Sequence, residues 1–516
     1  MFPSKSTPLV LFGFLVILAL GIGLRLYAFQ ANTRAYGDVN TIRNSASQYE
    51  KVGIVQYPWK LERFKTALND PLATPAYMHG PSIPFIAGLL SKLTGISDTF
   101  ITLKILTLTA GIVMLLLSYR LGVVLYRSQT GIIIMALFAT SPILIDFSAN
   151  GSPYIIATAF VLGADIIVSS FNFKRMRDYA LIGGLCSLAF LSLQAMLALS
   201  AAIILLGLIN IKRLSIKGVI IFIVTWLLCY TPALLWYLHY FDRPFISQQI
   251  NYIATELQLS GIERENFIAH PLSLLTPPLI QNYLGVMWQR LQIYGQNLNF
   301  ELSLPFVLTG VIAVIWGVWQ KPQRNQTMTI VLTRVAYFAI TSVGLALLHT
   351  RFLVPVVTAF FILIGWGLDR LNIGNRRFLS PIIVCLIIGY SGWAIWSYST
   401  LDTPPTRYYH DEVGINLEYD GAETIGKQLA QFPPATVIGC DDARRAIYYT
   451  DSRLVIIGCN APIDIIENAI SDPSLNVRYI LYKVEVIERL TGNFPDAKII
   501  AQNDMFAVLD LAPDTE

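Results

Sequence analysis

Nine segments of this sequence are apolar over the length of a membrane-spanning helix, and this feature constrains the fold more than any other. A spanning helix needs about 20 mainly apolar residues, because the hydrocarbon core is about 30 Å thick. Only 14% of the 516 residues are charged, against about a quarter in soluble domains. The sequence therefore predicts a mainly helical, multi-pass membrane protein. The predicted spans are 8–28, 99–126, 130–148, 153–171, 217–240, 302–320, 327–349, 351–371 and 379–399.

The first of these runs resembles a signal peptide, because a single lysine precedes it. No small-residue cleavage site follows it, and many further spans come after it. We therefore interpret 8–28 as a retained transmembrane helix.

The segment 178–210 is long for one span and short for two, and basic residues decide between these alternatives. Short cytoplasmic loops collect lysine and arginine. If all basic clusters are cytoplasmic, both ends of 178–210 lie on one side, and the segment is a hairpin of two short spans. The prediction is then 11 spans in the bacterial inner membrane, with the N-terminus cytoplasmic and the C-terminus external. The clusters are Arg120 with Arg127, "KRMR" 174–177, "IKRLSIK" 211–217, "QKPQR" 320–324 and "DRLNIGNRR" 369–377.

A further apolar piece, 80–95, is short for a span and contains two prolines. It is more typical of a helix that lies along the outer interface. The alternative is a true span, which would give 12 spans and place the C-terminal region in the cytoplasm.

The polar parts form two external loops, 29–98 and 241–301, and a tail, 400–516, outside the membrane domain 1–399. In the tail, β-branched runs alternate with helical ones, which predicts a small external α/β domain. No glycine-rich nucleotide fingerprint occurs, and a net charge of +4 gives no argument for nucleic acid binding. Cys440 and Cys459 either pair outside the cytosol or remain free thiols.

Asp38 is the first acidic residue of the chain and lies just past the first span. Apolar residues after it recur at helical spacing up to Gly53, which is a plausible stop. Asp38 therefore suits the N-cap of an interfacial helix. A carboxylate held there can also act as a general base or as a ligand for a divalent cation, Mg or Mn.

Three further stretches place polar groups near the membrane boundary. His79 precedes the short helix of 80–95. Asp146 lies in the last turns of a span, beside Asn150 and Tyr154, where it either faces a polar cavity or sits at a solvated helix end. His349 and Arg351 fill an external turn, where the guanidinium either binds phosphate oxygens or snorkels to the interface.

These pieces, in this order, resemble the GT-C superfamily of polytopic glycosyltransferases, in particular the protein O-mannosyltransferases and lipid A aminoarabinose transferases. The family has an early acidic motif, a short helix opened by a basic residue and Pro-Pro-Leu, a "SP…S" turn, and a late Arg-Tyr-Leu-x-Pro. The matching segments are "GDV" 37–39, "HGPSIPFIAGLLSKLTG" 79–95, "SPILIDFS" 141–148 and "RFLVP" 351–355. The second acid of the family has no counterpart, because Val39 occupies its position.

The resemblance implies a fold and an activity. The fold is a GT-C bundle of about 11 helices, with interfacial helices in the first loop. The activity is inverting transfer of a hexosyl or pentosyl group from a polyprenyl-phosphate donor to a lipid, glycan or protein acceptor. Asp38 is the implied base, Arg351 the phosphate ligand, and His79 the basic residue of the short helix. The rival readings are a transporter or scaffold without catalytic activity, and a surface-polysaccharide polymerase or ligase.

Overall fold

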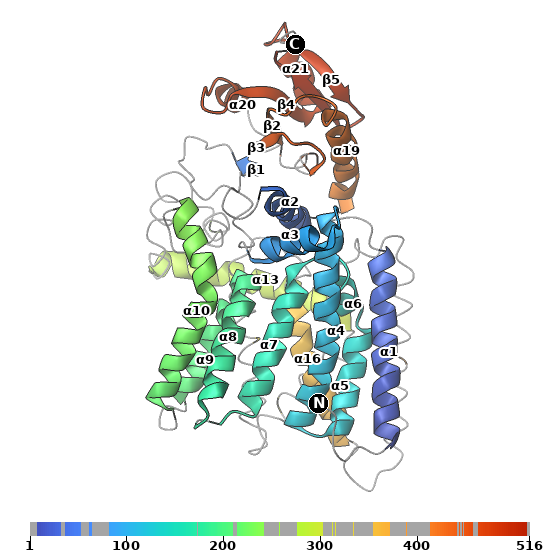
Figure 1. Cartoon of the computed structure of the whole chain (residues 1–516), viewed down its shortest axis with the longest axis vertical. Helices are drawn as coiled ribbons and strands as arrows, with labels where there is room; N and C mark the ends of the chain where they lie inside the picture. The colour runs from blue at the N-terminus through green and yellow to red at the C-terminus, as the bar shows by residue number, and fades with distance from the viewer. Residues whose placement is uncertain are drawn as a thin grey trace.

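The computed structural model has a helical bundle at one end and a small sheet at the other (Figure 1). Two elements of the first loop, α2 (Gly37–Val52) and α3 (Ser82–Thr94), lie between them. The structure describes residues 8–31, 37–52, 61–63, 82–172, 174–209, 214–241, 257, 276–302, 312, 315, 334, 354–371, 389, 413–440, 443, 446, 448–457 and 463–512.

Five of the nine predicted spans, 8–28, 99–126, 153–171, 217–240 and 351–371, coincide with described helices. The predicted spans 302–320, 327–349 and 379–399 lie outside the described residues, apart from single positions. Among the described residues, three helices are long and apolar enough to cross a membrane: Val10–Ala31, Thr99–Leu125 and Ile216–His239. The bundle consists of α1 (Pro8–Ala31), α4 (Thr99–Leu125), α5 (Ser128–Thr140), α6 (Pro142–Phe147), α7 (Pro153–Ser169), α8 (Met176–Ser192), α9 (Leu197–Ile209), α10 (Ile216–Phe241) and α16 (Val354–Leu371).

Small residues bring these helices close together. A Cβ atom on Gly122 of α4 would lie 2.5 Å from the Cα of Gly131 in α5, and one on Gly183 of α8 would lie 2.5 Å from the Phe222 carbonyl oxygen of α10. Bundles in lipid pack through such small residues, because no hydrophobic effect drives helix association there. We infer that these two glycines permit close crossings of α4 with α5 and of α8 with α10.

The predicted single span 130–148 is wrong, because the helix breaks at Ser141. Pro142 has no backbone N–H and cannot continue the ladder of α5. A new short helix, α6, begins at Pro142 with Ser141 as its N-cap. The chain is apolar on both sides of the break, so hydropathy alone gives no sign of it.

Residues 178–210 form the predicted helical hairpin, and the crossing of the membrane by its two arms stays a prediction. Helix α8 ends at Ser192, a 3-10 turn spans Gln194–Met196, and α9 begins at Leu197. The backbone N–H of Ser215 donates to the Tyr179 hydroxyl, so the starts of α8 and α10 lie at one level. Gln194 donates to Tyr237 near the far end of α10. The segment therefore leaves that level and returns to it.

Helix α3 has 13 residues and packs against α2, which favours the interfacial reading of 80–95. Arg43, in α2 before it, and Asp98, directly after it, form an ion pair at 3.1 Å. Two points on opposite faces of a bilayer cannot approach this closely, and 13 residues reach only about 20 Å. Arg43 and Asp98 therefore lie on one side of any membrane, and α3 is short for a span; the interfacial position of 80–95 stays a prediction.

The sheet lies in the tail, as predicted, with one strand that the sequence did not predict. Its order is β1-β3-β2-β4-β6-β5. The first four strands run parallel, and β6 is antiparallel to both of its neighbours. The strands are β1 (Leu61–Arg63), β2 (Thr436–Cys440), β3 (Arg453–Ile457), β4 (Val477–Lys483), β5 (Lys498–Gln502) and β6 (Phe506–Asp510); the helices beside them are α19 (Val413–Leu429), α20 (Ile463–Ile470) and α21 (Val484–Thr491).

The additional strand, β1, comes from the first loop and extends the sheet beyond β3, with Leu61 opposite Leu454 and Arg63 opposite Ile456. The tail therefore does not complete its sheet alone. Cys440 is a buried, free thiol in β2, and Cys459 lies outside the described residues.

The second predicted loop, 241–301, contains a long helix. Helix α13 (Pro277–Leu302) occupies its second half and carries exposed apolar side chains, including Leu284 and Trp288. This part of the loop is therefore helical, and its exposed apolar side chains could contact lipid.

Candidate functional site

Helix α2 presents Asp38 at its N-terminal turn. The helix begins at Gly37, so Asp38 is its second residue and not the predicted N-cap. It ends at Val52, which matches the predicted stop at Gly53. Three apolar residues at helical spacing, Val39, Ile42 and Ala46, are buried against α3 and α4. This packing fixes the rotation of α2 about its axis, and the position of Asp38 follows from it.

The N-terminal turn of α2 contacts the turn that follows α6. A Cβ atom on Gly151 would lie 3.1 Å from Val39 Cγ1 and 3.4 Å from a ring carbon of Phe100. The φ angle of Gly151 is +84°, which side chains other than glycine rarely adopt. Glycine therefore permits the close approach that brings the residue next to Asp38 against the 148–152 turn.

Asp146 and Asn150 form the polar part of that turn. The side-chain amide of Asn150 donates to Asp146 at 3.5 Å, and its oxygen accepts from the backbone N–H of Ser152 at 3.0 Å. Asp146 is fully buried, so the solvated-helix-end reading is wrong. A buried carboxylate needs polar partners, because its desolvation is costly.

Tyr154 lies in the first turn of α7, beside these groups. It is buried, and its ring meets that of Phe147 edge-on at 6.3 Å between centroids. The structure thus brings Asp146, Asn150 and Tyr154 together, next to the turn that carries Asp38. The remaining predicted site residues, His79, His349 and Arg351, lie outside the described residues.

Arg25 supports this turn from α1, and the sequence reasoning missed it. Its guanidinium donates to the carbonyl oxygens of Phe138 (3.0 Å) and Ala139 (3.4 Å), and to Ser148 Oγ (3.2 Å). Because Pro142 interrupts α5, these carbonyls lack helical partners, and a cation suits a helix C-terminus. A charge inside the first predicted span was the signal that would have identified Arg25.

Lys104 is a second cation that the sequence reasoning missed. It lies one turn and a half into α4 and is buried. Its ammonium donates to the backbone oxygen of Phe29 at the end of α1, and lies 4.1 Å from the centroid of the Phe29 ring. Lys104 therefore ties α4 to α1 close to the loop that leads to α2.

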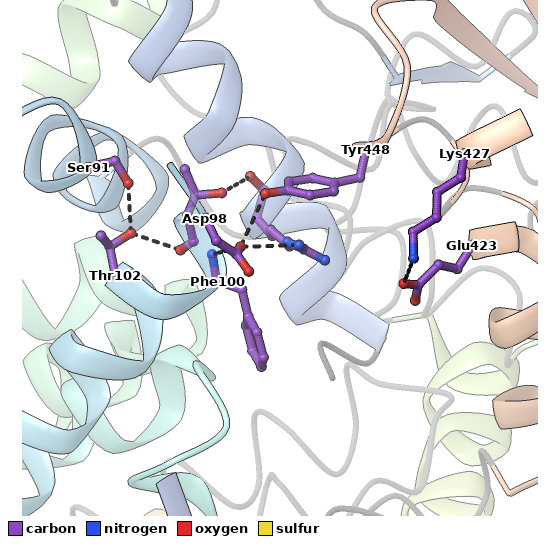
Figure 2. A network of polar contacts seen from close by, with 9 residues as sticks. Ser91, Asp98, Phe100, Thr102, Glu423, Lys427 and Tyr448 are labelled. Carbon is purple, nitrogen blue, oxygen red and sulfur yellow. Dashed lines mark hydrogen bonds and ion pairs between the residues drawn. The ribbon is translucent and has the colours of Figure 1, made fainter. Parts of the chain in front are cut away.

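A polar network joins the first loop to the tail (Figure 2). Asp98 caps α4 by accepting from the Phe100 N–H, and it also accepts from Arg43 and from the Tyr448 hydroxyl. Burial lowers the pKa of Arg43, but the adjacent Tyr448 and Asp98 raise it by more. The net result is a pKa above the ordinary value of an arginine. Burial raises the pKa of Tyr448, so its hydroxyl stays protonated and donates.

The described side chains offer no ready metal centre. Within the part of the chain that the structure describes, no three His, Cys, Asp or Glu residues converge. The described side chains of the site that could supply oxygen ligands are Asp146 and Asn150, and they are hydrogen-bonded to each other. This set does not fit a divalent cation by itself, since such ions take about six oxygen ligands.

Comparisons with known proteins identify the fold. No protein-family model matches the sequence, and no curated protein matches it. Among solved structures, ArnT from Cupriavidus metallidurans bound to undecaprenyl phosphate is 13% identical, with a TM-score of 0.57 over 97% of this chain and 98% of that chain.

Two structures of an Archaeoglobus fulgidus oligosaccharyltransferase are also similar. The apo form is 12% identical, with a TM-score of 0.58 over 92% of this chain and 70% of that chain. AglB in complex with an inhibitory peptide and a dolichol-phosphate is 12% identical, with a TM-score of 0.58 over 93% and 70%. The resemblance drawn from the motifs is thereby confirmed at the level of the fold: this chain has the fold of the GT-C glycosyltransferases.

Proposed function

We propose that this protein is a membrane glycosyltransferase that takes its sugar from a polyprenyl-phosphate donor. The observation that carries the proposal is the contact of Val39 with Gly151, which puts the turn of Asp38 against the turn of Asp146 and Asn150. The fold supports it, because the similar structures include one with undecaprenyl phosphate and one with dolichol-phosphate.

In this proposal Asp38 accepts the proton of the acceptor hydroxyl, whose oxygen attacks the anomeric carbon in line. The carbon–phosphate oxygen bond breaks, the configuration inverts, and polyprenyl phosphate leaves. Arg351 and His349 bind the leaving phosphate, since a planar guanidinium matches phosphate oxygens. His79, Asp146, Asn150 and Tyr154 line the cavity. No step is assigned to a metal ion.

The acceptor is a lipid, a glycan or a protein on the external face of the membrane. A structure of the archaeal enzyme was solved with a tethered acceptor peptide, and another with Zn and sulfate. These ligands belong to that protein. The buried pair of Asp165 with Arg334 removes the mid-span acid that a transport pathway would use, which favours the enzyme over a transporter.

The external location makes a topology prediction. A reporter fused after residue 450 should show the external signal, and one placed at 213, in a basic loop, the cytoplasmic signal. A reporter in the first loop should agree with the one at 450, because Arg43 and Tyr448 are in contact. A cytoplasmic signal at 450 would overturn the 11-span topology and the external site.

Transfer itself is tested with the purified protein in lipid vesicles. We expect it to release polyprenyl phosphate from at least one polyprenyl-phosphate sugar, in the presence of an envelope extract that supplies the acceptor. Mass spectrometry of envelope lipids, glycans and proteins from a deletion strain should show one product that lacks a sugar. An unchanged set of products, with a lipid confined to the wrong leaflet, would instead indicate transport.

A further inference from the structure

Two separate contacts bind the first loop to one short segment of the tail. One is the side-chain network of Arg43, Asp98 and Tyr448, which we call the latch. The other is the pairing of β1 with Leu454–Ile456 in β3. Both reach the tail between residues 448 and 457, and they join it to α2, to β1 and to Asp98 at the start of α4.

We propose that Arg43 is a positioning residue through which the tail holds α2, and with it Asp38, in place for glycosyl transfer. This inference rests on the function proposed above, in which Asp38 touches the acceptor. It gives the tail a part in the reaction, although every proposed site residue lies in 1–399.

Arg43 is built into the centre of this contact. It is buried, and its Cζ lies 3.4 Å from the centroid of the Tyr448 ring. One Nη atom donates to Asp98 at 3.1 Å. Its backbone oxygen accepts from the Thr99 hydroxyl at 3.1 Å. A flat guanidinium can stack on a ring and bond a carboxylate at once, which a lysine ammonium does less well.

The remaining contacts of the latch make it a junction of three parts of the molecule. Asp98 receives hydrogen bonds from α2, from the α4 backbone and from the tail. Beyond it, Thr102 donates to the Thr99 carbonyl and shares a hydrogen bond with Ser91 of α3. A change in the tail at Tyr448 therefore reaches α2, α3 and α4 through direct contacts (Figure 2).

The position of Arg43 along α2 explains why this matters for Asp38. The two residues are five apart, so Asp38 lies about 7.5 Å along the helix axis from the latch. If α2 tilts about the latch, its N-terminal turn moves by the tilt angle multiplied by this distance. A displacement of about 1 Å at a reacting group can cost about 10²-fold in rate.

The test measures transfer and helix order in the same full-length variants. Arg43→Ala should lower kcat by about 10²-fold with little change in the donor KM, because substrate binding is left in place. Tyr448→Phe keeps the ring and loses the hydroxyl, so its loss of kcat should be smaller than that of Tyr448→Leu. Arg43→Lys should fall between wild type and Arg43→Ala.

Backbone hydrogen exchange of α2 supplies the second readout. Exchange there should rise in Arg43→Ala and Tyr448→Leu in proportion to the loss of kcat. The matched control is Arg478→Ala, which removes the pair of Arg478 with Asp510 inside the tail sheet. It should leave α2 exchange and kcat as in wild type, which separates loss of the latch from general weakening of the tail.

The outcomes distinguish this inference from the proposed function. Full kcat in Arg43→Ala, or a lower kcat without faster exchange in α2, overturns the positioning role while wild-type transfer still supports the enzyme. A rise in KM alone also overturns it, because that result indicates substrate binding by Arg43. Absence of transfer by the wild type, with every donor tried, would overturn the proposed function first.

Discussion

Asp38→Asn should lower glycosyl transfer by about 10²-fold to 10⁴-fold, the range that a general base contributes. The substitution keeps the size and the hydrogen-bonding oxygen of the side chain but removes its ability to take a proton. Because Asn and Asp have similar helix propensities, α2 should remain folded. The measurement is release of polyprenyl phosphate by variant and wild type at equal amounts in vesicles.

The control for this variant is Asp472→Asn, which makes the same chemical change at an exposed turn of the tail. Asp472 accepts from Ser474 and lies far along the chain from the proposed site. Its transfer rate should equal that of wild type. If Asp38→Asn retains wild-type activity, Asp38 is not the base, and the site must be sought elsewhere.

The packing of Val39 explains why only one acid stands in the early motif. Val39 is about 1% exposed and lies in an apolar cluster with Ile42, Phe100 and Leu103. Its Cγ1 lies 3.1 Å from where a Cβ atom on Gly151 would be. An acid there would lose its hydration among apolar side chains, at a cost of several kcal/mol. The departure from the family pattern at position 39 is therefore part of how α2 packs.

Sequence patterns predict those helices and strands that are determined by the residues of their own segment. Helix α2 follows from apolar residues at a period of 3.6, and the tail strands follow from β-branched runs between turns. The described helices α1, α4, α7, α10 and α16 follow from long apolar runs, and α1, α4 and α10 are long enough to cross a membrane. In each case the residues that decide the element lie within it.

The features that the sequence did not predict depend on distant residues. Strand β1 has three residues, and its reason to be extended is β3, almost 400 positions later. Arg43 gave no signal as a site residue, because Tyr448 lies equally far along the chain. Asp146, Asn150 and Tyr154 were found because they share one short turn. The partner of their turn, Val39, was identified only as part of a helix face.

The largest expected effect on stability concerns the ion pair between Asp165 of α7 and Arg334, which lies in the predicted span 327–349. The two side chains are buried, and Arg334 Nη2 lies 2.7 Å from Asp165 Oδ2. Removing one partner leaves the other charge buried alone, which costs about 3–5 kcal/mol. Asp165→Leu and Arg334→Met should each lower the free energy of unfolding in bicelles by that amount.

The double variant with Asp165→Leu and Arg334→Met should recover most of this loss, because apolar groups of similar size replace the charges together. Arg177→Ala is the matched control, since Arg177 is mostly exposed and lies 3.9 Å from Asp178. It should change the free energy of unfolding by about 1 kcal/mol or less. If the double variant is as unstable as the sum of the single variants, the two charges do not stabilise each other. Arg334 would then be held beside Asp165 by packing, and not by the attraction of the two charges.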